Sequence, residues 1–324
     1  MDSSLYKSLT TSRNLKYSYY YSVPVVDKPV ILFVHGFPNT ANDWRHQVNF
    51  FKDQGYGIIA PDMLGYGDTD KPADHSQYTL SALARDVIDI LDAEKVDKAI
   101  AIGHDWGSIL VSRIANYHPD RFLAFAFLAV GYVGHSDATF DQFHAFTAKL
   151  ATRELFGYWY YFGEEDAHKT IENNFDSFYS LLMADDSALT AATLGPVGGF
   201  QTWVESDKKT AIASYLSEEE VKAHKQVLLQ GGLQGPLNWY KVRTTGLDIE
   251  DGKALTPEQK LVHQPVFFGG ATQDEICIPA MGKAGCAQFV KGPLTVKEFN
   301  AGHWLIWQVK DELNQALLEW VQGL

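Results

Sequence analysis

The sequence predicts an α/β protein, with a mostly parallel sheet covered by helices on both faces and interrupted by a helical insertion. In the first part of the chain, short apolar runs alternate with amphipathic segments, as expected for parallel strands joined by helices. Strand signals stop near residue 134 and return only near residue 264. The chain is therefore predicted to leave the sheet near residue 134 and to return to it near residue 264.

The predicted strands of the first part are short and apolar. Tyr17–Val23 is rich in aromatic and β-branched residues, which favour strands. Val30–Val34 is apolar throughout, the pattern of a strand buried on both faces. Between these strands, Ser81–Leu91 is predicted to form a helix, because its apolar residues fall on one helical face. The other strands predicted here are Gly57–Ala60, Lys98–Ile102 and Phe122–Val130.

The middle of the chain reads as aromatic-rich helices without a clear strand. Strand signals resume at Gln264–Gly269 and Leu294–Phe299, and an amphipathic helix follows at Lys310–Gln322. We therefore expect a first core segment at 1–133, a helical cap or lid at 134–248 and a second core segment at 249–324. An insertion of that size has room to form a lid.

The amino-acid composition limits the classes of molecule that the protein is expected to bind. The net charge of −13 opposes binding to nucleic acids and to anionic membranes. The longest apolar run, Phe122–Val130, is too short to span a bilayer, and Met1–Lys16 has no apolar core of a signal peptide. Two cysteines, Cys277 and Cys286, are too few for a disulfide framework and are expected to be reduced. These features predict a cytoplasmic protein and do not decide between a monomer and a homodimer.

A glycine-flanked aspartate follows the strand predicted at Lys98–Ile102. The chain reads Gly-His-Asp-Trp-Gly over residues 103–107, the spacing of a G-x-S-x-G turn with Asp105 in place of serine. An isolated aspartate between glycines is usually a turn residue, but one between a buried strand and a helix is presented as a nucleophile. With an ordinary pKa of about 3.9, its carboxylate is ionised at neutral pH and can attack an epoxide or halogen-bearing carbon directly.

An acid and a histidine follow in the order that such a nucleophile needs. Asp274 comes after the strand predicted at Gln264–Gly269, and His303 comes after the last strand, 29 residues later. His303 would activate water to hydrolyse the ester, and Asp274 would orient it and stabilise its imidazolium. Asp248 and Asp251 are alternatives to Asp274 if the second core segment begins earlier.

The oxyanion hole is predicted from two backbone N–H groups. One belongs to Trp106, directly after the nucleophile, and the other to Phe37 in the loop after Val30–Val34. His35 and His104 flank these positions. We interpret them as hydrogen-bonding supports of the loop and the turn, not as metal ligands, because no spaced His/Asp/Glu set accompanies them.

These motifs resemble the epoxide hydrolases of the α/β-hydrolase superfamily over essentially the full length of the chain. The matching core signatures are His-Gly-Phe-Pro at 35–38, Gly-His-Asp-Trp-Gly at 103–107, Asp274, and Gly-His-Trp at 302–304. The resemblance implies conversion of an epoxide and water to a vicinal diol through an ester on Asp105, without a cofactor or metal. It also implies a cis peptide bond before Pro38.

The resemblance further implies two tyrosines in the insertion that protonate the epoxide oxygen. Tyr158, in Phe-Gly-Tyr-Trp-Tyr-Tyr-Phe at 156–162, and Tyr240, in Leu-Asn-Trp-Tyr at 237–240, match the two positions of the family. An alkoxide is a poor leaving group and needs an acid, and a phenol with a pKa of about 10 keeps its proton at neutral pH. By spacing alone, Tyr160, Tyr161 and Tyr179 compete for the first position.

Two other functions use the same features. A haloalkane or haloacid dehalogenase shares the aspartate nucleophile, but there an asparagine commonly stands where this chain has Phe37, and paired tyrosines have no purpose with a halide leaving group. A ligand-binding protein of the same fold would need no hydrolytic set such as Asp105, Asp274 and His303. Epoxide hydrolysis is therefore the favoured hypothesis.

Overall fold

The computed structural model describes residues 1–324, and its contacts divide the chain into two compact units. The first unit consists of Met1–Asp70, Leu80–His135 and Ala254–Leu324, and the second consists of Lys71–Thr79 and Ser136–Lys253. The first unit contains all the named strands, and the second is helical.

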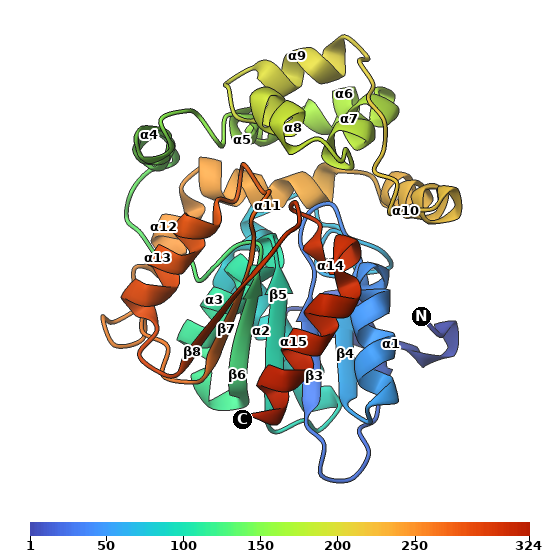
Figure 1. Ribbon diagram of the computed structural model, residues 1–324, viewed down its shortest axis with the longest axis vertical. Helices are drawn as coiled ribbons and strands as arrows, with labels where there is room; N and C mark the ends of the chain where they lie inside the picture. The colour runs from blue at the N-terminus through green and yellow to red at the C-terminus, as the bar shows by residue number, and fades with distance from the viewer. The chain divides into compact units, whose positions relative to one another are not determined.

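An eight-stranded sheet forms the centre of the first unit, in the order β1-β2-β4-β3-β5-β6-β7-β8 (Figure 1). Only β2 pairs antiparallel with its neighbours, β1 and β4, and every other pairing is parallel. The predicted mostly parallel sheet is therefore confirmed. The strands are β1 Tyr6–Thr10, β2 Lys16–Ser22, β3 Val30–Val34, β4 Gly57–Pro61, β5 Ala99–His104, β6 Phe122–Leu128, β7 Val266–Ala271 and β8 Leu294–Phe299.

Helices cover both faces of this sheet. Helices α1 and α15 pack together on one face, and α2 and α3 pack together on the other (Figure 1). Strands β3, β4 and β5 between them are buried along their whole length, which explains their unbroken apolar sequences. The α-helices of this unit are α1 Arg45–Asp53, α2 Leu80–Ala93, α3 Trp106–Tyr117, α13 Pro279–Phe289, α14 Leu305–Gln308 and α15 Lys310–Gln322, and its 3-10 turns are η1 Ser3–Leu5, η2 Ala41–Trp44 and η4 Pro119–Arg121.

Strand β1 is not predicted by the sequence analysis. It is an edge strand with no fully buried residue, so it needs no apolar run to form, and Met1–Lys16 reads simply as polar. It pairs with β2 from Tyr6 opposite Tyr20 to Thr10 opposite Lys16. Backbone pairing, rather than burial of its own side chains, explains this strand.

The second unit is built from helices α4 to α12 and the 3-10 turn η3, His75–Tyr78. The segment Lys71–Thr79 is held to α11 by the Asn238 side-chain amide, which donates to the carbonyls of Pro72 and Ala73. The helices are α4 Phe140–Ala151, α5 Tyr158–Gly163, α6 Ala167–Asn173, α7 Phe175–Leu182, α8 Ser187–Leu194, α9 Gly199–Glu205, α10 Glu218–Gly231, α11 Gln234–Thr244 and α12 Leu247–Gly252.

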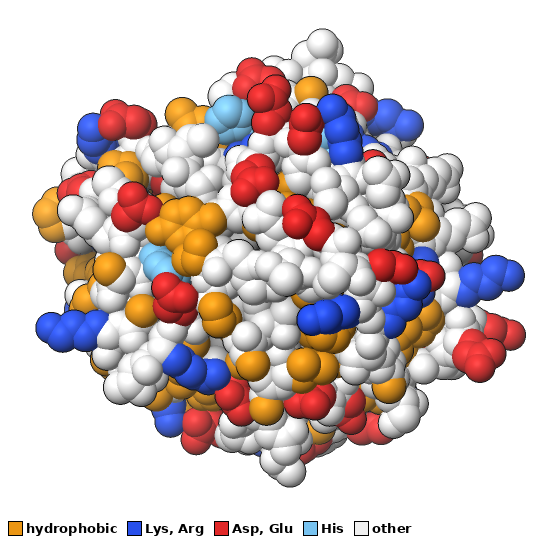
Figure 2. Space-filling model, turned by 90° about the horizontal axis from the view of Figure 1, so that it is seen from above, with side chains coloured by type: hydrophobic (Ala, Val, Ile, Leu, Met, Phe, Trp, Pro, Cys, Tyr) orange, Lys and Arg blue, Asp and Glu red, His pale blue; other side chains and the backbone are white.

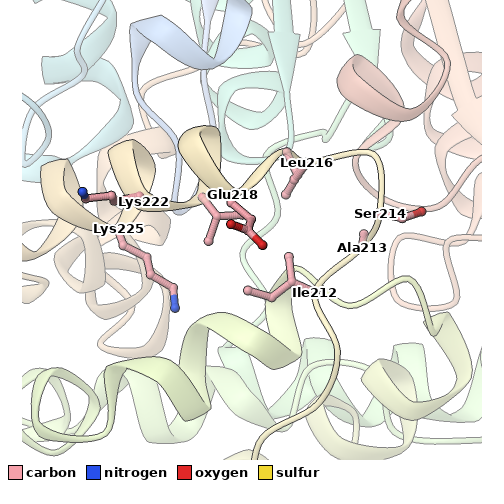
Figure 3. Close-up of a pocket in the computed structure, with 8 residues that line it drawn as sticks. Ile212, Ala213, Ser214, Leu216, Glu218, Lys222 and Lys225 are labelled. Carbon is pink, nitrogen blue, oxygen red and sulfur yellow. The ribbon is translucent and has the colours of Figure 1, made fainter.

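A shallow cavity lies within the second unit, between the 212–216 loop and the beginning of α10 (Figure 3). Its walls are mainly apolar, and Lys225 on its rim pairs with Asp176 of α7. None of the residues proposed for catalysis lines it. The lining residues are Ile212, Ala213, Ser214, Leu216, Glu218, Val221, Lys222 and Lys225.

The surface carries mixed charges on the face shown in Figure 2, where acidic and basic side chains are interspersed. No helix is both long enough and apolar enough to cross a lipid bilayer.

Candidate active site

The turn from β5 to α3 holds Asp105 in a strained backbone conformation. Its φ of 55° and ψ of −123° lie outside the regions that non-glycine residues prefer. Both flanking glycines are required by close packing. A Cβ on Gly103 would collide with the backbone of Gly107, and one on Gly107 would collide with the backbone of Val34. The sharp turn is therefore locked between strands, and it presents Asp105 at the N-terminus of α3.

Asp274 and His303 meet because β7 and β8 are adjacent and parallel. Ala271 pairs with Phe299 at their carboxyl ends, so the loops that follow begin side by side. The Asp274 carboxylate is buried, and one of its oxygens lies 2.6 Å from His303 Nδ1. Its other oxygen accepts the backbone N–H groups of Ile276 and Cys277, at 3.0 and 2.8 Å. These bonds fix the carboxylate, and it in turn orients the imidazole.

The second nitrogen of this imidazole faces Asp105. His303 Nε2 lies 3.5 Å from Asp105 Oδ2. The strand order thus brings together Asp105 after β5, Asp274 after β7 and His303 after β8, all within the first unit. The arrangement can form an ester on Asp105 and then direct water to that ester.

The site favours the charged form of all three groups. Burial alone would raise the pKa of Asp105, but the hydrogen bond and charge of His303 outweigh it and hold that pKa below its usual value. The pKa of Asp274 is lowered as well, because the charge and hydrogen bond of His303 outweigh burial. Burial opposes the charge on His303, but Asp274 and Asp105 together raise its pKa well above the usual value. Asp105 is therefore an anion in the resting site.

The Phe37 N–H lies where an oxyanion donor is needed. It donates to Asp105 Oδ1 at 2.9 Å, and the Phe37–Pro38 peptide bond is cis. The loop approaches so closely that a Cβ on Gly36 would lie 2.5 Å from the Cβ of Asp105. The second donor expected from the sequence, the N–H of Trp106, belongs to the first residue of α3 and stays a prediction.

A family model described as the alpha/beta hydrolase fold matches residues 29–308. The chain belongs to this family.

Curated relatives are similar along nearly the whole chain. The chain is 29% identical to "Epoxide hydrolase A" of Mycobacterium tuberculosis over 91% of its own length and 91% of the relative. It is 28% identical to "Bifunctional epoxide hydrolase 2" of Sus scrofa over 91% of its own length, but it spans only about half of that relative, 51%. The crystal structure of Epoxide Hydrolase A from Mycobacterium thermoresistibile is 26% identical with a TM-score of 0.79, and the match covers 98% of both chains.

The two histidines beside the site make structural hydrogen bonds. His35 bonds the carbonyl of Gly36 through Nδ1 and accepts the N–H of Met63 through Nε2, at 2.9 Å each. His104 is fully buried, and its Nε2–H donates to the carbonyl of His303 at 2.9 Å. Burial, followed by the nearby charge of His303, lowers the pKa of His104 to about 4, so it stays neutral. His104 therefore ties the turn that carries Asp105 to the loop that carries His303.

Tyr158 and Tyr240 are neighbours within the second unit. Tyr158 begins α5 and Tyr240 lies in α11, two helices that pack against each other. Their ring centroids are 5.9 Å apart in an edge-to-face arrangement. The two phenols come from positions 82 residues apart, so the packing of α5 on α11 brings them together.

Two competing tyrosines have other partners. The Tyr160 hydroxyl donates to the Asp141 carboxylate at 2.6 Å, and burial together with this bond raises its pKa to about 12. The Tyr179 hydroxyl bonds His224 Nδ1 at 3.0 Å. These contacts bind both hydroxyls to other side chains of the second unit, and the assignment of Tyr158 to the first tyrosine position stays a prediction.

Cys277 lies beside a predicted catalytic loop, and sequence reasoning assigned it no role in the site. Its backbone N–H bonds Asp274, and its thiol lies close to His303. Burial, more than the nearby Asp274 charge, raises the pKa of this thiol to about 12, so it is not a thiolate nucleophile. The signal available was the Asp-x-x-Cys spacing, which a tight turn after a strand folds into one cluster.

Proposed function

We propose that this protein hydrolyses epoxides to vicinal diols through a covalent ester on Asp105. One observation carries the proposal: an ionised aspartate at the β5–α3 turn faces His303 Nε2 at 3.5 Å, and His303 is oriented by Asp274. The similarity of the chain to the epoxide hydrolases described above supports the same substrate class.

In the first step Asp105 Oδ2 attacks an epoxide carbon. Oδ1 accepts the Phe37 N–H at 2.9 Å, and Oδ2 faces His303 Nε2 at the longer distance of 3.5 Å, so we assign the new bond to Oδ2. As the Oδ2–carbon bond forms, the carbon–oxygen bond of the ring breaks and its electron pair moves to the former epoxide oxygen. That oxygen then needs a proton.

We propose Tyr158 and Tyr240 as the donors of that proton. They are paired across α5 and α11, and two phenols can hydrogen-bond the two lone pairs of one epoxide oxygen. One phenol transfers its proton as the ring opens and regains a proton at the end of the cycle, when the Asp105 carboxylic acid left by ester hydrolysis ionises. In this proposal the second unit supplies the acid groups of the reaction.

In the second step His303 removes a proton from water, and the hydroxide adds to the carbonyl carbon of the Asp105 ester. Negative charge develops on Oδ1, where the Phe37 N–H donates, with Trp106 N–H as the proposed second donor. Collapse of this intermediate expels the diol alkoxide, which takes the proton from His303, and an oxygen from water remains in Asp105.

The ester itself prepares His303 for this step. The bond to Asp105 is one of the interactions that raise the pKa of His303 in the resting site. Esterification removes the negative charge of Asp105, so the pKa of His303 falls and its neutral form becomes available as a base. The scheme uses only side chains, backbone N–H groups and water.

Product analysis tests the proposal. The protein is incubated with styrene oxide and, in parallel, with a chloroalkane, and diol and halide are measured. We expect diol without halide, and one turnover in ¹⁸O-labelled water should place label in Asp105. Halide without diol would instead identify a dehalogenase, and absence of label from Asp105 would rule out the ester.

A further inference from the structure

Three different metal-ligating groups meet at the carboxyl ends of β7 and β8. A carboxylate oxygen of Asp274, the thiol sulfur of Cys277 and a ring nitrogen of His303 all lie within 4.8 Å of one another. Asp274 is buried, and the other two side chains are partly buried. Catalysis as proposed uses the first and third of these groups and has no use for the thiol.

We propose that Asp274, Cys277 and His303 form an inhibitory binding site for a thiolate-preferring divalent cation, Zn²⁺ or Cd²⁺. This inference rests on the proposed function for its inhibitory consequence, but not for the binding itself. The cation would be a reversible ligand of the resting protein, not a participant in epoxide opening.

The geometry is close to that of a three-ligand zinc site. Bonds of about 2.3 Å to sulfur and about 2.0–2.1 Å to nitrogen and oxygen place tetrahedral ligand atoms roughly 3.3–3.8 Å apart. The 2.6 Å contact between Asp274 and His303 would open by about 1 Å to reach that range, and the separations from the Cys277 sulfur, which are at most 4.8 Å, would adjust to it. Water would take the fourth position.

The ligand set selects the metal. A thiolate and an imidazole favour Zn²⁺ and Cd²⁺, whereas Mg²⁺ and Ca²⁺ prefer oxygen ligands and would gain only one here. Binding replaces two protons, one from the Cys277 thiol and one from the hydrogen bond between His303 and Asp274. No electron transfer is involved.

The bound cation would disable the base and spare the nucleophile. Nδ1 is the His303 nitrogen that faces Asp274, so it is the nitrogen that the cation would take. Nε2 would then keep its proton, directed at Asp105, and could no longer accept one from water. We therefore expect Zn²⁺ to block hydrolysis of the ester more strongly than its formation.

Binding is tested first, without reference to activity. The purified full-length chain is titrated with Cd²⁺, and the thiolate-to-cadmium charge-transfer absorption is followed; Zn²⁺ competes in a second titration. We expect one equivalent for the wild type, loss of this absorption in Cys277→Ala, and no such loss in the matched control Cys286→Ala, whose thiol lies on α13.

Two further variants keep the test decisive if Cys277→Ala folds poorly. Asp274→Asn and His303→Gln should each weaken Cd²⁺ binding, although Cys277 remains in both. A signal that survives in Cys277→Ala, follows Cys286, or ignores Asp274 and His303 would overturn the site.

Kinetics then test the consequence. With Zn²⁺ bound, mixing with excess epoxide should give a burst of Asp105 adduct, seen by mass spectrometry of the quenched protein, and little diol. Mg²⁺ should have no such effect. Inhibition of adduct formation itself, or equal inhibition of the wild type and Cys277→Ala, would contradict the proposed role. Failure of all epoxides to react would remove the proposed function, while the Cd²⁺ titration would still decide the site.

Discussion

The two units place their proposed functional groups by different physical means. In the first unit Asp105, Asp274 and His303 each follow a strand of one sheet, and strand order alone brings them together. In the second unit Tyr158 and Tyr240 lie on helices, and only side-chain packing between α5 and α11 determines where their hydroxyls lie.

We infer from this difference that the groups of the first unit are held rigidly, whereas the positions of the two phenols of the second unit are adjustable. Backbone pairing in a sheet fixes a position through many hydrogen bonds, whereas helix packing tolerates changes of side chain. We therefore expect the charge-handling groups of the first unit to be indispensable. Loss of one phenol of the second unit should reduce turnover only in part.

The largest effect is expected from Asp105→Asn. An amide cannot form the alkyl ester, so diol formation should fall by at least about 10⁴-fold. Initial rates with styrene oxide measure this, and Asp105→Ala serves as a control against deamidation of the introduced asparagine. Full activity in a preparation that mass spectrometry shows to be free of deamidated protein would place the nucleophile elsewhere.

His303→Gln should reduce turnover by about 10³-fold or more, because the ester then lacks its base. Unlike Asp105→Asn, His303→Gln should leave ester formation intact, so that a covalent adduct on Asp105 accumulates. Peptide mapping after a rapid quench measures the adduct. A loss of turnover without any adduct would argue that His303 acts before or during ring opening.

Tyr158→Phe and Tyr240→Phe should each reduce turnover by about 10–100-fold, and the double variant by about 10²–10⁴-fold. Either phenol can hydrogen-bond the oxygen alone, which is why the single losses are smaller. Tyr160→Phe is the matched control, since its hydroxyl is bound to Asp141. If Tyr160→Phe is as damaging as Tyr158→Phe, the assignment of the first position is wrong.

The rigidity of the β5–α3 turn can be tested with glycines. Gly107→Ala forces a Cβ into the backbone of Val34 and should lower the free energy of unfolding by about 3 kcal/mol or more. Gly198→Ala, in the second unit, has a positive φ but open space, so it should cost only about 1 kcal/mol. Denaturant unfolding of both variants gives the comparison, and equal losses would show that packing at the turn is not special.

The smallest effect concerns Asp62, whose carboxylate accepts the N–H of Ala41. Burial raises its pKa from 3.8 to about 6, so the folded protein holds this proton more tightly than the unfolded chain. Ionisation therefore destabilises the fold as pH rises from about 4 through about 6, by on the order of 2–3 kcal/mol. Asp62→Asn should remove this contribution from the pH profile of the unfolding free energy over that window, and a profile identical to that of the wild type would assign the pH dependence to other groups.

Most of the first unit could be predicted because its signals are local. Strands β5 and β7 are buried, continuous apolar runs followed by Asp105 and Asp274, and β8 is a mostly exposed strand followed by His303. The order of nucleophile, acid and histidine along the chain then predicted that the three side chains meet. Strand β1 escaped prediction because an exposed edge strand needs no apolar pattern.

The rest depends on contacts between distant positions. Nothing near Tyr158 in the chain indicates that it packs beside Tyr240, and only the family resemblance pointed to the pair. The clustering of Cys277 with His303 likewise arises from the turn after β7 and the loop after β8, whose closeness is visible only once the sheet is formed.

The long interruption between β6 and β7 has a consequence for biosynthesis. Strand β6 ends at Leu128 and its partner β7 begins at Val266, so the ribosome completes the nucleophile turn long before it has translated the acid and the histidine. Such distant pairing is slow to form. Under the proposed mechanism, a nascent chain that has folded only through β6 would carry an aspartate able to capture an electrophile and no means of releasing it.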